Sequence, residues 1–383
     1  MYQHIDIVLN QQSKITETTC GDVFYRERLA QHTTLILCDG KGHGIKANFA
    51  ATMNVSYLSK LLQSGFSLRQ AFDNLIDFFK QVGSDGGHYA VFSMMRIHND
   101  GMVNILSFSM PAPIFISPTA GAKILNLREI ETENGIINES NCYIKSGEGI
   151  MLMSDGITQA GIGRSLDWGW KDTGVCKFIN DNYIKKDIDF VRLSDEIIGE
   201  VYKINNNNYD DDITNAIAFA REGNVCNVIT GPPAEKKNDI SVIRKFMSAE
   251  GDKIVCGGTT ANVVSKILNT TLIYNTEHSN PYTPPEFIIN GIDLATEGAI
   301  TLNQLDNIIE ERRDLMNNDS PVTKLYDKLM KADKIIFWLG INNSVDEKTL
   351  DFIKMGLKSR QHIVPLLAEK LKELGKLVVI ERI

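Results

Sequence analysis

The run Thr34-Leu35-Ile36-Leu37-Cys38, followed directly by Asp39-Gly40-Lys41-Gly42-His43-Gly44, decides the fold of the first half of this chain. A short apolar run bounded by Gly and Asp is typical of a buried β-strand. We therefore expect Asp39 at the end of a strand, where a rigid scaffold holds its carboxylate. The glycines that follow allow backbone and ligand to approach each other closely.

Three further acidic motifs lie beside apolar runs elsewhere in the first 222 residues. They are Gly21-Asp22, Ser154-Asp155-Gly156 and Asp211-Asp212-Ile213-Thr214. An isolated Asp-Gly is usually only a turn. Four such acids at strand ends, in this order, indicate instead a site for hard divalent cations, which prefer oxygen ligands.

The order of these motifs resembles that of the metal-dependent PPM (PP2C-type) protein phosphatases, in particular their SpoIIE-like bacterial branch. The resemblance covers residues 1–222 approximately, and the run from Asp39 to Gly44 is its most specific part. It implies a site for two divalent cations, Mn²⁺ or Mg²⁺. It also implies hydrolysis of a phosphomonoester by direct attack of a water or hydroxide that bridges the two ions.

The resemblance also implies a role for each acid. Asp39 would bridge both ions, with the carbonyl of Gly40 on one of them. Asp22 would complete the shell of one ion, and Asp155 and Asp211 would hold the other. Asp212 would lie outside the ligand set and support it. The neighbouring Asp210 is not required by the motif, and we interpret it as a solvated loop charge.

His43 has two alternative interpretations. An imidazole beside the ions could protonate the leaving serine or threonine oxygen or contact the phosphate. Alternatively, His43 is a structural loop histidine, because eukaryotic-type members of the family carry their histidine directly after Asp-Gly. Lys41 is either a phosphate-steering residue or an exposed loop lysine. No basic residue upstream of Asp22 is assigned as a phosphate contact.

The segment from Cys20 to Arg26 has the Cys-x5-Arg spacing of cysteine-dependent phosphatases. Such a loop wraps backbone N–H groups around phosphate, which requires small residues and no acid. Here it contains Asp22 and two aromatic residues that alternate as in a strand. We therefore reject a thiol mechanism.

The overall composition restricts the function further. A formal net charge of −8 argues against nucleic acid or an anionic membrane as the main partner. No apolar stretch approaches the length of a membrane span, and the N-terminus lacks the features of a signal peptide. The six cysteines are far apart and show no Cys-x-x-Cys spacing, which is typical of reduced residues in a cytoplasmic protein.

The length of 383 residues indicates two domains, which we place at 1–222 and 224–383. For the first, hairpin signals and paired helices predict an α+β fold, a sandwich of two antiparallel sheets flanked by helices. The PPM family has this αββα architecture. Expected strands are 88–97, 102–109, 114–117 and 150–153. One helix is expected to end at Gly65 and a second to begin at Ser67, and two more are expected near 172–182 and 190–203.

The second domain alternates strand-like and helix-like segments, which predicts a smaller α/β domain with a mainly parallel sheet. Expected strands are 224–230, 253–256, 271–274, 334–339 and 376–381, and expected helices are 239–249, 259–268, 301–315, 321–331 and 347–373. The turn Gly257-Gly258-Thr259-Thr260 between a strand and a helix could bind an anion, or it is a plain turn with a threonine N-cap. A regulatory ligand, a partner, a homodimer surface and a purely structural role are all open alternatives for this domain.

Together these features predict a cytoplasmic serine/threonine phosphoprotein phosphatase in bacterial regulatory signalling. By analogy with the SpoIIE-like branch, its substrate would be a phosphorylated regulator of the anti-sigma-antagonist kind. The alternative is a signalling adaptor with a vestigial catalytic half, whose second domain binds a ligand or a partner protein.

Overall fold

The computed structural model describes residues 2–82, 90–132, 135–183, 188–275, 284–313, 316, 320–341 and 356–383. The chain divides into two compact units. One comprises Gln3–Glu222, and the other comprises Gly223–Ile383 with Met1–Tyr2. Each unit has its own sheets and its own hydrophobic core.

The first unit contains two antiparallel sheets. The five-stranded sheet has the order β1-β11-β10-β6-β7, and the six-stranded sheet has the order β2-β3-β4-β5-β9-β8. The strands of the first sheet are β1 Gln3–Gln12, β6 Ile114–Ser117, β7 Gly121–Ile124, β10 Gly149–Met153 and β11 Ile213–Glu222. Those of the second are β2 Asp22–Arg28, β3 His32–Gly40, β4 Ala90–His98, β5 Met102–Phe108, β8 Arg128–Thr132 and β9 Gly135–Tyr143.

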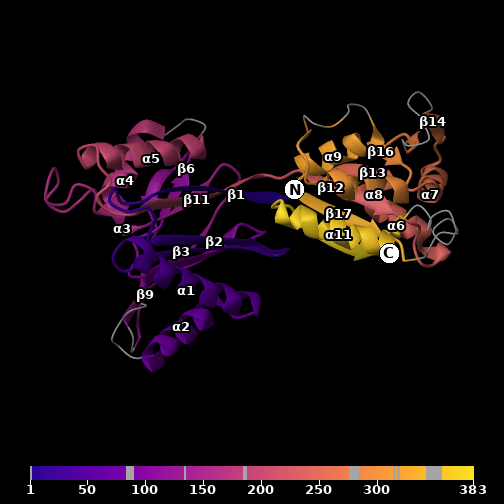
Figure 1. The fold of residues 1–383 in the computed structure, drawn as a ribbon. Helices are drawn as coiled ribbons and strands as arrows, with labels where there is room; N and C mark the ends of the chain where they lie inside the picture. The colour runs from indigo at the N-terminus through magenta and orange to yellow at the C-terminus, as the bar shows by residue number, and fades with distance from the viewer. Residues whose placement is uncertain are drawn as a thin grey trace. The chain divides into compact units, whose positions relative to one another are not determined.

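Pairs of helices cover the outer faces of these sheets (Figure 1). Helices α1 (Gly44–Gln63) and α2 (Leu68–Val82) pack on the six-stranded sheet, and α4 (Lys171–Tyr183) and α5 (Phe190–Ile204) pack on the five-stranded sheet. The short helix α3 (Asp155–Thr158) directly follows β10. This arrangement confirms the predicted αββα sandwich.

Strand β3 shows why its sequence is apolar without alternation. Ile36 and Cys38 face the core beneath α1 and α2, whereas Leu35 and Leu37 face the core between the sheets. A strand in the middle of a layered sandwich is buried on both sides, so every position requires an apolar side chain. The end of this strand, which carries Asp39, is therefore rigidly held.

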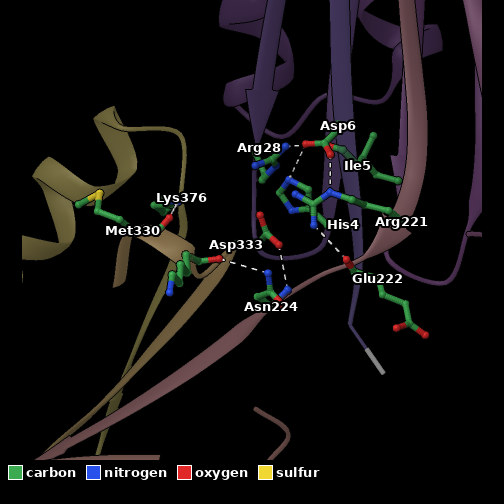
Figure 2. A network of polar contacts seen from close by, with 11 residues as sticks. His4, Ile5, Asp6, Arg28, Arg221, Glu222, Asn224, Met330, Asp333 and Lys376 are labelled. Atoms are coloured by element: carbon green, nitrogen blue, oxygen red, sulfur yellow. Dashed lines mark hydrogen bonds and ion pairs between the residues drawn. The ribbon is translucent and has the colours of Figure 1, made fainter. Parts of the chain in front are cut away.

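A polar network joins the two sheets of the first unit at one edge (Figure 2). Asp6 on β1 accepts hydrogen bonds from His4 and from Arg221 on β11. Arg28 on β2 donates to the backbone carbonyl of Ile5. Burial raises the pKa of Asp6, but the hydrogen bonds and charges of His4 and Arg221 outweigh it and lower the pKa to about 2.

The second unit is built on one seven-stranded sheet with the order β14-β15-β16-β13-β12-β17-β18. The pairings from β16 to β18 are parallel, and those of β14 and β15 are antiparallel. The predicted mainly parallel sheet is thus confirmed. The strands are β12 Val225–Thr230, β13 Asp252–Cys256, β14 Ile273–Asn275, β15 Glu286–Ile288, β16 Leu294–Thr296, β17 Lys334–Leu339 and β18 Leu377–Arg382.

Helices cover both faces of this sheet. Helices α8, α9 and α11 share a core with one face, and α6 and α7 share a core with the other. At the start of β12, the backbone N–H of Asn224 donates to the carboxylate of Asp333 (Figure 2). The helices are η1 Lys236–Asn238, α6 Asp239–Ser248, α7 Gly258–Leu268, α8 Ala299–Ile308, α9 Pro321–Lys331 and α11 Arg360–Glu373.

Two predicted helices of this unit have other bounds in the described residues. The helix expected at 301–315 ends at Ile308, because the charged run from Glu310 to Arg313 has no apolar face to bury. The helix expected at 347–373 begins at Arg360; residues 356–359 are not helical, and 347–355 lie outside the described residues. No helix in the described ranges combines the length and hydropathy needed to cross a bilayer.

Candidate active site

Asp22 and Asp39 are cross-strand neighbours. Asp22 opens β2, and it pairs in antiparallel register with Asp39 near the end of β3. Directly opposed residues of an antiparallel pair lie about 5 Å apart at their Cβ atoms. Asp22 is 3% exposed, and its Oδ1 has no hydrogen-bond partner among the described residues.

Asp155 and Asp211 approach the same place from the other sheet. Asp155 is the first residue of α3, directly after β10, and its Oδ2 accepts a 2.7 Å hydrogen bond from Gln159. Asp211 precedes β11 and accepts a bond from the backbone N–H of Asp212. Each sheet therefore contributes two of the four acids.

These side chains border a cavity of about 460 Å³. Its lining residues are Lys14, Asp39, Gly40, Lys41, Gly42, His43, Val91, Asp155, Asp211 and Asp212. Asp22 is not on this wall and is buried beside Asp39. The structure thus brings the four motifs together, although they are far apart in the sequence.

The carboxylates perturb one another strongly. Burial raises the pKa of Asp39 to about 9, and the charges of Asp22 and Asp155 add to the increase. Burial also raises the pKa of Asp22 to about 7, although hydrogen bonds from Thr214 and Ser154 oppose it. Burial and the charge of Asp155 raise the pKa of Asp211. The repulsion among these acids outweighs the opposing charge of Lys14, which lowers the pKa of Asp211.

These residues fit hard divalent cations. All four acids are oxygen donors, and the orphaned Oδ1 of Asp22 is a buried acceptor without a partner. Among the described residues, no three His, Cys, Asp or Glu side chains form a ready-made cage for a metal ion. A cage is not required, because Mg²⁺ keeps several waters and is usually held by one or two carboxylates.

Asp212 lies on the cavity wall and binds the loop between β1 and β2. It is 5% exposed, and its two oxygens accept hydrogen bonds from the backbone N–H groups of Lys14 and Gly21 at 3.0 and 2.9 Å. With both oxygens engaged, Asp212 fixes the loop that leads into Asp22.

Gly40 must be glycine for a steric reason. A Cβ at this position would collide with the backbone of Ala47 in the first turns of α1. The close approach brings the start of α1 against the end of β3. The loop from Lys41 to His43 between them is therefore short and lies on the cavity wall.

Sequence reasoning missed four residues that surround the site. Thr214 donates a 2.6 Å hydrogen bond to Oδ2 of Asp22, and its backbone N–H donates to the hydroxyl of Ser154. Lys14, upstream of Asp22, lies on the cavity wall and lowers the pKa of Asp211 against the effect of burial. Glu17 contacts His43 at 2.7 Å. Ser154 and Thr214 lie inside quoted motifs, whereas Lys14 and Glu17 occur in a polar loop that carries no pattern.

Two other sequence interpretations concern this region. Asp210 forms an ion pair with Arg164 at 3.0 Å and does not line the cavity, so it is more than a solvated loop charge. The segment from Cys20 to Arg26 is mostly strand β2 rather than a phosphate-binding loop. Burial and the charge of Asp22 raise the pKa of the Cys20 thiol, which opposes formation of a thiolate.

The glycine turn of the second unit is occupied by its own hydrogen bonds. The N–H of Gly257 donates to the carbonyl of Thr296, and the hydroxyl of Thr260 accepts from the N–H of Gly231. Gly298 packs against Gly257, and the preceding Glu297 accepts hydrogen bonds from the N–H groups of Ala299 and Ile300. These contacts favour the plain turn, but the N-cap of α7 is Gly257 and not the expected threonine. Gly258 and the exposed Thr259 give no further indication of an anion-binding site.

The first unit, a sandwich of two antiparallel sheets with four acids gathered at one end, has the fold of the PP2C-like phosphatases. Residues 30–219 match the family model of stage II sporulation protein E (SpoIIE). This segment is a SpoIIE-family domain. No curated protein sequence matches the chain.

Solved structures with a similar fold include bacterial phosphatase domains. The PP2C phosphatase domain of SpoIIE from Bacillus subtilis, with a fragment of its regulatory domain, is 18% identical, with a TM-score of 0.49. That alignment covers 57% of this chain and 64%, less than two thirds, of the other. The RsbU and RsbW domains of Rv1364c from Mycobacterium tuberculosis are 17% identical over 63% of this chain and 67% of that one, with a TM-score of 0.46. RsbX, solved in complex with magnesium, is 14% identical over 57% and 96%, with a TM-score of 0.41.

Proposed function

We propose that the first unit is a metal-dependent serine/threonine phosphoprotein phosphatase. The observation that carries the proposal is the gathering of Asp39, Asp155 and Asp211 around one cavity with basic residues on its wall, with Asp22 buried beside Asp39. A phosphomonoester dianion requires more positive charge than Lys14 and Lys41 supply beside four acids, and bound cations would provide it. Membership of the SpoIIE family supports the same conclusion.

The proposed ligand arrangement uses oxygen donors alone. Asp39 would serve both ions and the carbonyl of Gly40 one of them, Asp22 would serve one, and Asp155 and Asp211 would serve the other. When bound, two Mn²⁺ or Mg²⁺ ions supply an activated water and neutralise charge on the phosphoryl oxygens. The chain itself holds this arrangement in place through Asp212 and Thr214.

The remaining wall residues act on the substrate. Lys14 and Lys41 lie at the cavity and attract the phosphate. His43 lies on the same wall and is half exposed, so it can reach the leaving oxygen of a bound phosphoserine. We assign it the role of general acid, because a serine alkoxide is a poor leaving group without a proton.

The proposed substrate is a phosphorylated regulatory protein of the anti-sigma-antagonist kind. This part of the proposal rests on the family alone. The position of the cavity at the edge of the sandwich, bordered by loops, suits a flexible phosphorylated segment. For the second unit we propose a regulatory or dimerisation role without chemistry of its own.

The test is phosphate release from a panel of phosphoserine and phosphothreonine peptides. Wild-type protein with Mn²⁺ should be active, whereas chelator-treated protein and Asp39→Asn should not. If metal-replete wild type releases no more phosphate than Asp39→Asn from any peptide, the phosphatase proposal fails and the adaptor alternative gains support.

A further inference from the structure

The side chains of Glu17 and His43 form a carboxylate–imidazole pair at the edge of the cavity. Glu17 lies in the loop between β1 and β2, and its Oε1 is 2.7 Å from Nδ1 of His43. Glu17 is the only hydrogen-bond partner of this imidazole ring among the described residues. The carboxylate is an acceptor only, so Nδ1 carries the hydrogen of this bond.

The loop that carries Glu17 is fixed at several points. Lys14 and Gly21 donate backbone hydrogen bonds to Asp212, and the N–H of Ile15 donates to the carbonyl of Tyr209. Asn48 of α1 donates a 2.8 Å bond to the carbonyl of Cys20. Glu17 is therefore attached both to the segment that bears Asp211 and to the helix that follows His43.

The backbone at Gly44 is adapted to the same carboxylate. Gly44 has a φ of +71°, and a Cβ at this position would collide with the carboxylate of Glu17. A glycine here leaves room for the carboxylate beside the first turn of α1. The contact between Glu17 and His43 thus depends on the last glycine of the Asp39–Gly44 motif.

We propose that Glu17 is a positioning residue for His43, an inference that rests on the proposed phosphatase function. By accepting the Nδ1 hydrogen, Glu17 fixes one ring orientation, and the Nε2–H of the protonated ring is left for the substrate. The side chain of His43 is 49% exposed and that of Glu17 is 28% exposed, so without this bond the imidazole would rotate freely. In other enzymes, too, a carboxylate accepts a hydrogen bond from a catalytic histidine and orients its ring.

The step that this pair serves is proton donation to the leaving group. The oxygen of a water forms a bond to phosphorus, and the bond from phosphorus to the serine oxygen breaks. The electron pair of that bond stays on the serine oxygen, which takes the proton from Nε2 of the His43 imidazolium and leaves a neutral ring with its hydrogen on Nδ1. The proton lost by the water returns to His43 through solvent, so the reaction yields the alcohol and inorganic phosphate.

A comparison of two substrates tests this role. Phosphoserine leaves as an alkoxide and needs the proton, whereas p-nitrophenyl phosphate leaves as a stable phenolate and needs it much less. The enzymes to compare, with saturating Mn²⁺, are wild type, the isosteric Glu17→Gln, His43→Asn and the double variant. A structural defect would affect both substrates alike.

We expect Glu17→Gln to lower kcat on a phosphoserine peptide roughly 10-fold or more, with KM little changed. His43→Asn should lower it about 100-fold. For each variant, the loss on the peptide should exceed the loss on p-nitrophenyl phosphate by about 10-fold. The double variant should be no worse than His43→Asn, because Glu17 acts through His43.

Several results would overturn the inference. Equal losses on both substrates would show that Glu17 only supports the loop, and an unchanged kcat on the peptide would show that it has no role. Additive losses in the double variant would show that the two residues act separately. A wild-type protein inactive on both substrates would instead refute the phosphatase proposal, and this inference with it.

Discussion

The hydroxyl of Thr214 donates a 2.6 Å hydrogen bond to Oδ2 of Asp22, a residue 192 positions earlier in the chain. The same hydroxyl accepts a bond from Nε2 of Gln11 at 3.0 Å. Asp22 is thereby left with Oδ1 as its single free acceptor among the described residues. The last residue of the fourth motif orients the acid of the first.

Replacing Thr214 should weaken metal binding without changing the ligands themselves. Thr214→Val removes the hydroxyl but keeps the shape, so Asp22 loses its orienting donor. Loss of such a supporting bond costs about 10- to 100-fold in metal affinity. The measurement is the Mn²⁺ concentration that gives half-maximal activity. Thr214→Ser, which retains the hydroxyl, should resemble wild type; equal behaviour of the two variants would contradict this role.

The acid cluster should make the metal-free protein sensitive to alkaline pH. The pKa of Asp39 in the folded protein, about 9, lies above the ordinary value of 3.8. The folded state then binds more protons than the unfolded state between these values, so stability falls as pH rises through this interval. In chelator, the melting temperature of wild type should fall relative to that of Asp39→Asn from about pH 5 to about pH 9.

Cations should reverse this effect. A ligand that binds only the folded state, at a concentration about 100 times its Kd, stabilises by about 2.7 kcal/mol. Addition of Mn²⁺ should therefore raise the melting temperature of wild type, and raise it much less for Asp39→Asn. If the melting temperatures of the two metal-free proteins had the same pH dependence, the pKa of Asp39 would not be raised in the folded state.

Gly40→Ala tests the close contact between β3 and α1. The added methyl would meet the backbone of Ala47, which cannot move without displacing the helix. We expect a destabilisation of about 1–3 kcal/mol or more, measured by denaturant unfolding. The matched control is Gly199→Ala in α5, where a Cβ meets open space. That change should stabilise by about 0.5–1 kcal/mol, because alanine favours the helix. Comparable stability of the two variants would contradict the contact.

Asp6 should contribute to stability above about pH 4. Its pKa is lowered from 3.8 to about 2 in the folded protein, so its stabilising effect is lost as pH falls between these values. Asp6→Asn should cost about 0.5–1 kcal/mol at neutral pH, because the ion pair with Arg221 is partly exposed. The difference from wild type should shrink towards pH 2 in acid unfolding curves. Asp181→Asn, an exposed control on α4, should show no such trend.

Much of this architecture is predictable from the sequence. The strand from Thr34 to Cys38, with Asp39 at its end, was predicted correctly because a strand buried on both sides requires a continuous apolar run. The two helices that follow were also predicted correctly. The order of the four motifs predicted the class of fold. The acids were predictable as a set because each ends or begins an apolar run.

The remainder depends on contacts that no local pattern encodes. Strand β1 alternates polar and apolar residues only weakly, and its pairing with β11 joins opposite ends of the first unit. Glu17 and Lys14 reach the site because the loop between β1 and β2 is tied to Asp212. Such long-range hydrogen bonds are consequences of the fold. Their participants are ordinary polar loop residues in the sequence.

The number of Mn²⁺ ions bound per chain tests the central claim most directly. Equilibrium dialysis of metal-free wild type, with Asp39→Asn as the comparison, measures it independently of any substrate. We predict two bound ions for wild type and, for Asp39→Asn, binding weaker by at least about tenfold. A wild-type protein that binds no ions, or a variant that binds them equally well, would contradict the account.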